Sequence, residues 1–194
     1  MEYNALALWA IEKYDGTDHG LSSLPGFAAA VAAAKTGAKV ALIERYGSLG
    51  GLFTNGMVLL MLSTSRRNGS GWELVSRGVC EEFMLRVGRF GTVFSSKPEN
   101  TCPGEHWQPT VVMDEMIAER KNVEMFFHSW GVDVIQDGDK VLGVVFESKE
   151  GRQAILASQV VDCTGDADML FRAGGDYRQI THGIGHVVRL GNMD

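Results

Sequence analysis

The sequence predicts an α/β protein with a doubly wound parallel sheet, and three features of its pattern carry that prediction. An alanine-rich helix precedes a short buried strand and a glycine-rich loop. A second helix and strand follow in the same order, as crossover connections between parallel strands require. Three short segments of strand pattern, separated by turn residues, then predict an antiparallel meander inserted before the last strand.

The first helix and the strand after it are the clearest elements. Residues 5–11 are apolar, but their pattern does not distinguish strand from helix, so the first strand of the sheet is not recognisable. Without a strand there, its neighbours would keep unpaired backbone groups. Pro25 suits the first turn of a helix, and the alanine-rich run 27–35 continues it. Residues 38–45 then predict a buried strand, and 46–51 a flexible loop.

A less regular region separates these elements from the next helix. Within it, apolar residues recur at spacings of three and four, which predicts one amphipathic helix. The residues in this pattern are Trp72, Val75, Val79, Phe83 and Val87. Pro109 then opens a second helix that runs to about Lys121, and residues 123–128 follow as a strand.

The last part of the chain contains the predicted meander and one more strand. The meander strands are 132–136, 141–148 and 152–157. The next strand, 159–166, ends in small and acidic residues and leads into a short helix that ends near Ala173. Residues 187–190 have a strand pattern with nothing left in the chain to pair with. We therefore expect the sequence to stop at the entry to a further domain.

Composition narrows the classes of function. The 194 residues include 18 Lys and Arg against 24 Asp and Glu, for a net charge of −6. Nucleic-acid binding, which needs clustered basic residues, is therefore not expected. No apolar run reaches the roughly 18 residues of a membrane span. The N-terminus lacks a secretory pattern and the three cysteines are widely spaced, so we expect a cytoplasmic protein.

The order of helix, strand and charged strand end suits a dinucleotide site. In a doubly wound fold the helix N-terminus offers amides to a pyrophosphate, and an acid at the end of the second strand holds a ribose hydroxyl. Gly26 lies at the helix start, and Glu44 follows 18 residues later, close to the usual separation of about 20. The acid favours a free 2′-hydroxyl over a 2′-phosphate, although the adjacent Arg45 leaves both open.

The glycine fingerprint itself is broken. Counting back from Gly26, the first two glycines of G-x-G-x-x-G fall on Leu21 and Ser23, where side chains oppose close approach of the backbone to phosphate. By this pattern alone, nucleotide binding and a plain α/β domain with an alanine-rich core helix are equally open.

A second motif points to a family. The run from Pro25-Gly-Phe-Ala-Ala-Ala to Gly50-Gly51, with Val160-Val-Asp-Cys-Thr-Gly-Asp166 far downstream, resembles the FAD-dependent oxidoreductases of the glutathione-reductase-like Rossmann superfamily. The resemblance extends from about Leu24 to Asp194 and includes the meander. It implies a Rossmann-type FAD/NAD(P)-binding fold with a parallel sheet and inserted antiparallel meander, here truncated, with FAD as cofactor and an unknown small molecule as substrate.

The resemblance also implies cofactor-binding positions. Gly26 matches the last glycine of the dinucleotide loop, and Glu44 the acid that binds the adenosine ribose. The glycine pair 50–51 lies where the chain passes close to the cofactor, 131–132 where relatives contact adenine through the backbone, and 164–166 where a strand end approaches FAD. The full set is Gly26, Glu44, Arg45, Gly50, Gly51, Gly131, Val132, Thr164, Gly165 and Asp166.

The resemblance divides the chain into three parts: an atypical segment 1–20, the FAD-binding domain 21–178, and the start of a substrate domain whose remainder is missing, 179–194. The chain is then the FAD-binding, N-terminal portion of a flavin-dependent oxidoreductase. A non-catalytic truncated remnant or binding module with a degraded nucleotide loop is the alternative, and an NAD-dependent dehydrogenase half is less favoured. Catalytic residues and substrate are unknown, and a homo-oligomer is left open.

Other side chains have simpler interpretations. No metal site is predicted, because the glycines around His182 and His186 oppose the helix these residues would need to share an ion. Glu44 could be an exposed strand end, and Gly50-Gly51 a plain turn. Asp166 and Asp168 also suit capping of the helix that follows them.

Overall fold

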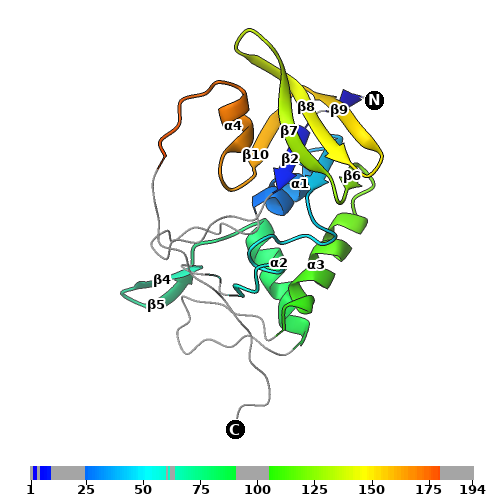
Figure 1. The fold of residues 1–194 in the computed structure, drawn as a ribbon. Coiled ribbons are helices and arrows are strands. Elements are labelled where there is room, and N and C mark those ends of the chain that lie inside the picture. Colours follow the sequence, from blue (N-terminus) through cyan, green and yellow to red (C-terminus); the bar gives the residue numbers. More distant parts are fainter. Residues whose placement is uncertain are drawn as a thin grey trace.

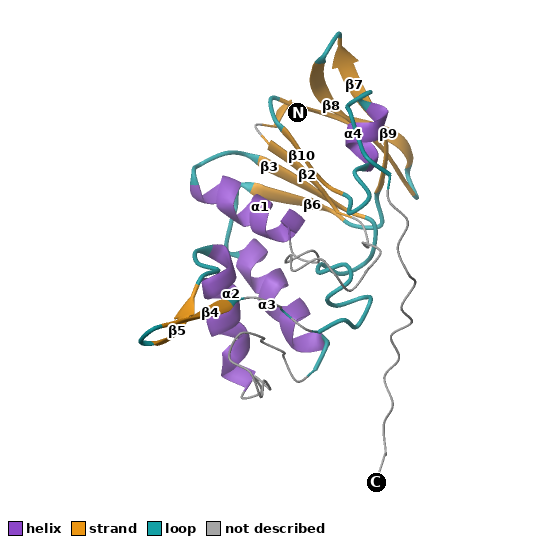
Figure 2. Ribbon diagram, turned by 90° about the vertical axis from the view of Figure 1, so that its left-hand side faces the viewer, coloured by secondary structure: helices purple, strands orange, loops and turns teal. Residues whose placement is uncertain are grey.

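The computed structural model describes residues 2–3, 5–9, 25–59, 61, 64–90 and 105–179, and it contains two four-stranded sheets and a helical layer (Figure 1). The first sheet has the order β10-β2-β3-β6 and is parallel throughout. The second has the order β1-β9-β8-β7. Figure 2 shows the parallel sheet between helices α1 to α3 on one side and the second sheet with α4 on the other.

The parallel sheet consists of β2 (Ala5–Trp9), β3 (Val40–Glu44), β6 (Val123–Phe126) and β10 (Val160–Cys163). Each residue of β3 is buried, as expected for a strand covered on both faces. Its side chains alternate between two cores. Val40 and Leu42 join the helical core, whereas Ala41 and Ile43 join the core under the meander. Strand β3 therefore contributes side chains both to the core under the helices and to the core under the meander.

Strand β2 is the central strand that the sequence did not identify. It pairs with β10 on one side and with β3 on the other, so that Trp9 stands opposite both Cys163 and Glu44. The sequence alone gave no recognisable first strand, and the structure corrects this: residues 5–9 form that strand and pair along both of its edges. The 15 residues between β2 and α1, 10–24, lie outside the described residues, and Leu21 and Ser23 are among them.

Three helices pack against the sheet and one another: α1 (Pro25–Lys35), α2 (Val79–Val87) and α3 (Trp107–Ala118). Phe83 of α2 is central, with its ring centroid 5.8 Å from that of Phe27 and 6.3 Å from that of Phe53, both in edge-to-face contact. All three rings are 1% exposed. The 3₁₀ turn Gly88–Phe90 extends the end of α2.

The amphipathic helix predicted over 72–87 is only half correct. It begins at Val79, because Gly78 has a left-handed φ of 70° that stops the helix from extending backward. Trp72 lies instead in β5 (Gly71–Leu74), which forms a hairpin with β4 (Ser65–Asn68). The spacing of Trp72 from Val79 was therefore a coincidence of helical period.

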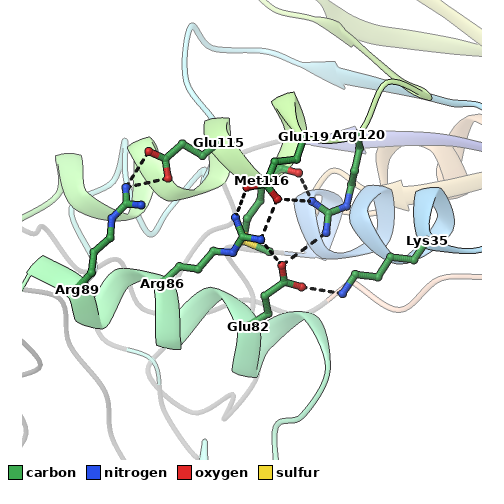
Figure 3. A network of polar contacts seen from close by, with 8 residues as sticks. All are labelled: Lys35, Glu82, Arg86, Arg89, Glu115, Met116, Glu119 and Arg120. Atoms are coloured by element: carbon green, nitrogen blue, oxygen red, sulfur yellow. Dashed lines mark hydrogen bonds and ion pairs between the residues drawn. The ribbon is translucent and has the colours of Figure 1, made fainter.

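A network of ion pairs joins the three helices (Figure 3). Glu82 of α2 binds Nζ of Lys35 on α1 at 2.7 Å and Nη2 of Arg86 at 2.6 Å. Arg86 also pairs with Glu119, just after α3, at 2.6 Å. Further contacts are Arg89 with Glu115 and Arg120 with Glu82 and with the carbonyl of Met116. The network fixes α2 between its two neighbours.

All three predicted meander strands are confirmed, each slightly longer than expected: β7 (Trp130–Asp137), β8 (Lys140–Ser148) and β9 (Gly151–Ala157). They pair antiparallel, and β1 (Glu2–Tyr3) adds a parallel edge to β9. Helix α4 (Asp168–Arg172) follows β10 and buries Met169 in the same core as Phe146 of β8.

Candidate functional site

The carboxyl edge of the parallel sheet gathers most of the predicted site residues. Because β3, β6, β2 and β10 point the same way, their ends meet at one edge. The register places Glu44 and Cys163 on either side of Trp9, at the same level. Helix α1 connects parallel strands β2 and β3, so it runs back along the sheet and its N-terminus, with buried Gly26, lies toward this edge.

Glu44 is the most unusual side chain of the edge. It ends β3 and is 0% exposed, so the interpretation as an exposed strand end is wrong. Its Oε1 accepts a hydrogen bond of 2.8 Å from the backbone N–H of Tyr46. Its Oε2 is buried and has no hydrogen-bond partner within the part of the chain that the structure describes. Burial raises the pKa of this carboxyl to about 8, although the backbone N–H groups of Tyr46 and Arg45 partly oppose the rise.

Arg45 turns toward aromatic rings rather than toward Glu44. Its Cζ lies 4.1 Å from the ring centroid of Trp130 and 5.4 Å from that of Tyr46, a cation–π arrangement. The side chain therefore bridges the end of β3 and the start of β7. This position leaves the carboxylate of Glu44 without a neighbouring cation from its own segment.

The glycine loop after β3 is determined by its own packing. Gly50 has a φ of +111°, and a Cβ there would lie 2.4 Å from Oγ1 of Thr54 and 2.8 Å from Cε of Met113. Gly51, also buried, has a φ of +47°. The Thr54 hydroxyl donates to the carbonyl of Leu49 at 2.6 Å, which closes the loop. Thus a tight, buried turn is sufficient to explain Gly50, whether or not a ligand approaches it.

The connection from β6 to β7 is held against the end of β3. The backbone N–H of Ser129 donates to the carbonyl of Glu44 at 3.0 Å, and that of His128 donates to the carbonyl of Tyr46 at 3.2 Å. Gly131 pairs with Phe146, but the register with β8 shifts before Asp133, so Val132 is a bulged residue. Because of the bulge, Val132 has no partner residue in the register of β7 with β8.

The loop after β10 is organised by Asp162, a residue that the sequence analysis did not single out. Its Oδ1 accepts from the N–H and the hydroxyl of Thr164, at 2.9 and 2.7 Å. Its Oδ2 accepts from the N–H groups of Met169 and Leu170, both at 3.0 Å. The Thr164 hydroxyl in turn accepts from the N–H of Asp168 at 2.8 Å.

Asp162 and Thr164 therefore bind the first amides of α4, the role that the sequence suggested for Asp166 and Asp168. Asp166 is exposed instead, next to Gly165, whose φ is +89°. Local capping rules place the acceptor within three residues of the amides it binds, whereas Asp162 stands seven and eight residues before its partners. No local sequence signal reveals it.

Cys163 ends β10 and is a half-buried free thiol. Burial, with a smaller contribution from Asp162, raises the pKa of the Cys163 thiol to about 11, which suits a packing residue rather than a nucleophile. Among the described residues, no group of three or more His, Cys, Asp or Glu side chains could hold a metal ion. His182 and His186 lie outside them. None of the described helices is both long and apolar enough to cross a membrane.

Known proteins share this architecture. The sequence profile of the family described as FAD dependent oxidoreductase matches residues 22–187. No curated protein sequence matches the chain. Among solved structures, THI4 from Thermovibrio ammonificans superposes with a TM-score of 0.56 at 19% identity, covering 88% of this chain and 61% of that one.

Two further structures give similar values. A geranylgeranyl bacteriochlorophyll reductase-like protein from Thermoplasma acidophilum has a TM-score of 0.54 at 16% identity, over 89% of this chain and 42% of that one. The anhydrotetracycline hydroxylase OxyS from Streptomyces rimosus has 0.52 at 12%, over 88% and 34%. The chain therefore spans less than two thirds of each. At these identities the likeness shows the fold, and the predicted Rossmann-type architecture is confirmed.

Proposed function

The chain belongs to the FAD dependent oxidoreductase family and is the flavin-binding portion of a flavin oxidoreductase; from this premise we propose that the carboxyl edge of its parallel sheet binds FAD. The observation that carries the proposal is the buried, unpartnered Oε2 of Glu44 at the end of β3. A buried carboxyl oxygen without a partner is costly, and a ribose hydroxyl docked there would donate the missing hydrogen bond.

The rest of the edge offers complementary groups for the other parts of the cofactor. The first amides of α1, next to Gly26, point along the helix axis toward the edge and suit the pyrophosphate. The bulged backbone of Val132 and buried Gly131 suit the edge of the adenine. Gly51 and the segment Thr164 to Asp166 complete the proposed lining, with Arg45 stacked on Trp130 beside it.

FAD, when bound, supplies hydride or electron transfer, and the chain's own residues bind and orient it. In this proposal Glu44 anchors one end of the cofactor, and Asp162 holds the Thr164 loop in place through its four hydrogen bonds. The substrate is a small molecule whose class no described residue identifies. The free thiols of Cys80 and Cys163 suit a cytoplasmic setting.

The test is a titration of the purified, folded chain with FAD, followed by flavin fluorescence and by the visible absorbance retained after desalting. We expect saturable binding that Glu44→Ala weakens strongly, because the ribose would lose its acceptor. Glu147→Ala, which removes an exposed acid of the meander that pairs with Arg152, is the matched control and should bind like the wild-type chain. Failure of the folded wild-type chain to bind FAD would favour the remnant that has lost its nucleotide site.

A further inference from the structure

The unpartnered oxygen of Glu44 raises the question of which protonation state this carboxyl has in the folded chain. The side chain is 0% exposed, its Oε1 accepts from the backbone N–H of Tyr46, and its Oε2 has no partner within the described residues. A buried carboxylate needs a cation or several donors to stay ionised. Within the described residues, backbone N–H groups are its donors and one oxygen is bare, so the neutral acid is the more stable form.

The charged groups around Glu44 do not change this conclusion. Arg45, on the same segment, is engaged with the rings of Trp130 and Tyr46. From the β6–β7 connection, the His128 ring lies against Gly47, where a Cβ would be 2.9 Å from its Cε1 and Nε2. At the start of α4, Asp168 is near enough for Arg45 to act on it electrostatically. No described side chain therefore stabilises a negative charge on Glu44.

A bound ribose would make the ionised form of Glu44 more stable than the neutral acid. Its two neighbouring hydroxyls are both hydrogen-bond donors, and a carboxylate accepts from both, whereas a neutral acid must keep one oxygen protonated. Charge-assisted hydrogen bonds are the stronger ones, so the docked diol favours the ionised form. The proton that Glu44 gives up leaves to the solvent.

We propose that docking of an adenosine ribose ionises Glu44, so that the chain takes up FAD and releases one proton to the buffer for each FAD bound. The inference rests on the proposed function and adds a linkage to it. The step is balanced, since the neutral acid and the free diol become a carboxylate hydrogen-bonded to the diol, plus one proton. It also makes the ribose diol the group selected at Glu44, because a 2′-phosphate would bring a second negative charge to the carboxylate.

The linkage predicts that FAD affinity rises with pH. Below the pKa of about 8, only the ionised fraction is competent to bind, so affinity should increase about tenfold per pH unit. Between about pH 6 and about pH 8 the gain is on the order of 50-fold, and it levels off at higher pH. Glu44→Gln should bind more weakly, with an affinity that does not change over this range.

Isothermal titration calorimetry in two buffers of different ionisation enthalpy counts the protons directly. At about pH 7 we expect close to one proton released per FAD for the wild-type chain and for the exposed-acid control Glu147→Gln, and none for Glu44→Gln. FAD binding without proton release, and with an affinity independent of pH, would overturn the linkage and leave the proposed function standing. Absence of FAD binding at every pH would overturn both.

A second measurement tests the protonation state of Glu44 in the absence of added FAD. The infrared difference spectrum between the wild-type chain and Glu44→Gln, at about pH 6, should contain the carbonyl stretch of one protonated carboxylic acid. A carboxylate band in its place would show that Glu44 is already ionised, and the inference would then fail even if FAD binds.

Discussion

Two glutamates of the same domain have opposite surroundings: Glu82 is partly buried among cations, and Glu44 is fully buried with no cation beside it among the described residues. Glu82, in the helical layer, lies within 2.7 Å of Lys35, 2.6 Å of Arg86 and 3.7 Å of Arg120 (Figure 3). Its pKa is lowered, first by the hydrogen bond from Lys35. Glu44, at the edge of the sheet, has no such cation, and burial raises its pKa to about 8.

The difference separates a structural group from the group that we propose binds a ligand. Glu82, Glu115 and Glu119 are paired with cations of the helical layer itself, so they need nothing from a ligand. The pairing in this layer is not complete, because Nε of Arg120 lacks a partner in the described region. The other two nitrogens of that guanidinium are bound. Glu44 keeps half of its carboxyl unsatisfied. Groups whose protonation is perturbed without a structural partner are the ones expected at functional sites.

The largest expected effect is a pH dependence of stability that belongs to Glu44. Since its pKa is higher in the folded chain than the ordinary 4.5, the folded state holds a proton that the unfolded state has lost. The contribution of Glu44 to the free energy of unfolding is therefore largest below about pH 4.5. It falls by about 1.4 kcal/mol per pH unit up to about pH 8. The total loss in the FAD-free chain is on the order of 5 kcal/mol.

Urea unfolding of the wild-type chain and Glu44→Gln across this pH range measures the effect as a difference. The two curves should diverge as pH rises, with Glu44→Gln becoming the more stable protein at alkaline pH. Parallel curves would mean that Glu44 finds a partner in the folded chain, and the contrast with Glu82 would disappear.

The next effect tests whether the glycine loop is fixed by packing. In Gly50→Ala the new Cβ would lie 2.4 Å from Oγ1 of Thr54, at a φ of +111°, so we expect a loss of about 3 kcal/mol in unfolding free energy. Gly37→Ala is the matched control, because it has a φ of +88° but nothing within 4 Å of the Cβ, and should cost about 1 kcal/mol. Equal costs would show that backbone strain alone requires Gly50.

The sequence predicted the elements whose signal is local. The helix after Pro25, the strand Val40–Glu44 and the three meander strands each carry their own periodicity and turn residues, and all are confirmed. The run Ala5–Trp9 carries no period that separates strand from helix, and its identity comes from pairing on both sides. The hairpin at Trp72 was missed because its residues happened to repeat at helical spacing.

The site was predictable in its position but not in its state. The spacing from Gly26 and the strand end identified Glu44, yet burial of Oε2 without a partner depends on how distant segments close around it. Asp162 was missed for the same reason, since its partners stand beyond the reach of any local capping rule. Assignment of Glu44 and of the other positions to FAD contacts stays a prediction.

A smaller effect is expected from Asp162, the group at the edge that is fully satisfied. Asp162→Ala leaves the N–H groups of Met169 and Leu170 without their acceptor and should cost about 2 kcal/mol in unfolding free energy. Hydrogen exchange should accelerate at these two amides before it does in the meander. Asp166→Ala, an exposed acid of the same loop, should change stability by less than about 0.5 kcal/mol. A larger effect there would assign the capping to Asp166 after all.

The smallest effect is expected at Glu82, although it has more partners than Glu44. Glu82→Gln removes the charge facing Lys35 and Arg86, but Arg86 keeps its pair with Glu119, and Lys35 is partly exposed to water. Such partly exposed pairs are worth little, so we expect a loss of about 1 kcal/mol in thermal or urea unfolding. Roughly 1 M salt should reduce this difference further by screening, whereas the Glu44 effect, which comes from burial, should persist. A loss at Glu82 as large as the pH-dependent loss at Glu44 would contradict this order. The number of partners, rather than the unpaired oxygen, would then determine how strongly an acidic side chain affects the stability of this fold.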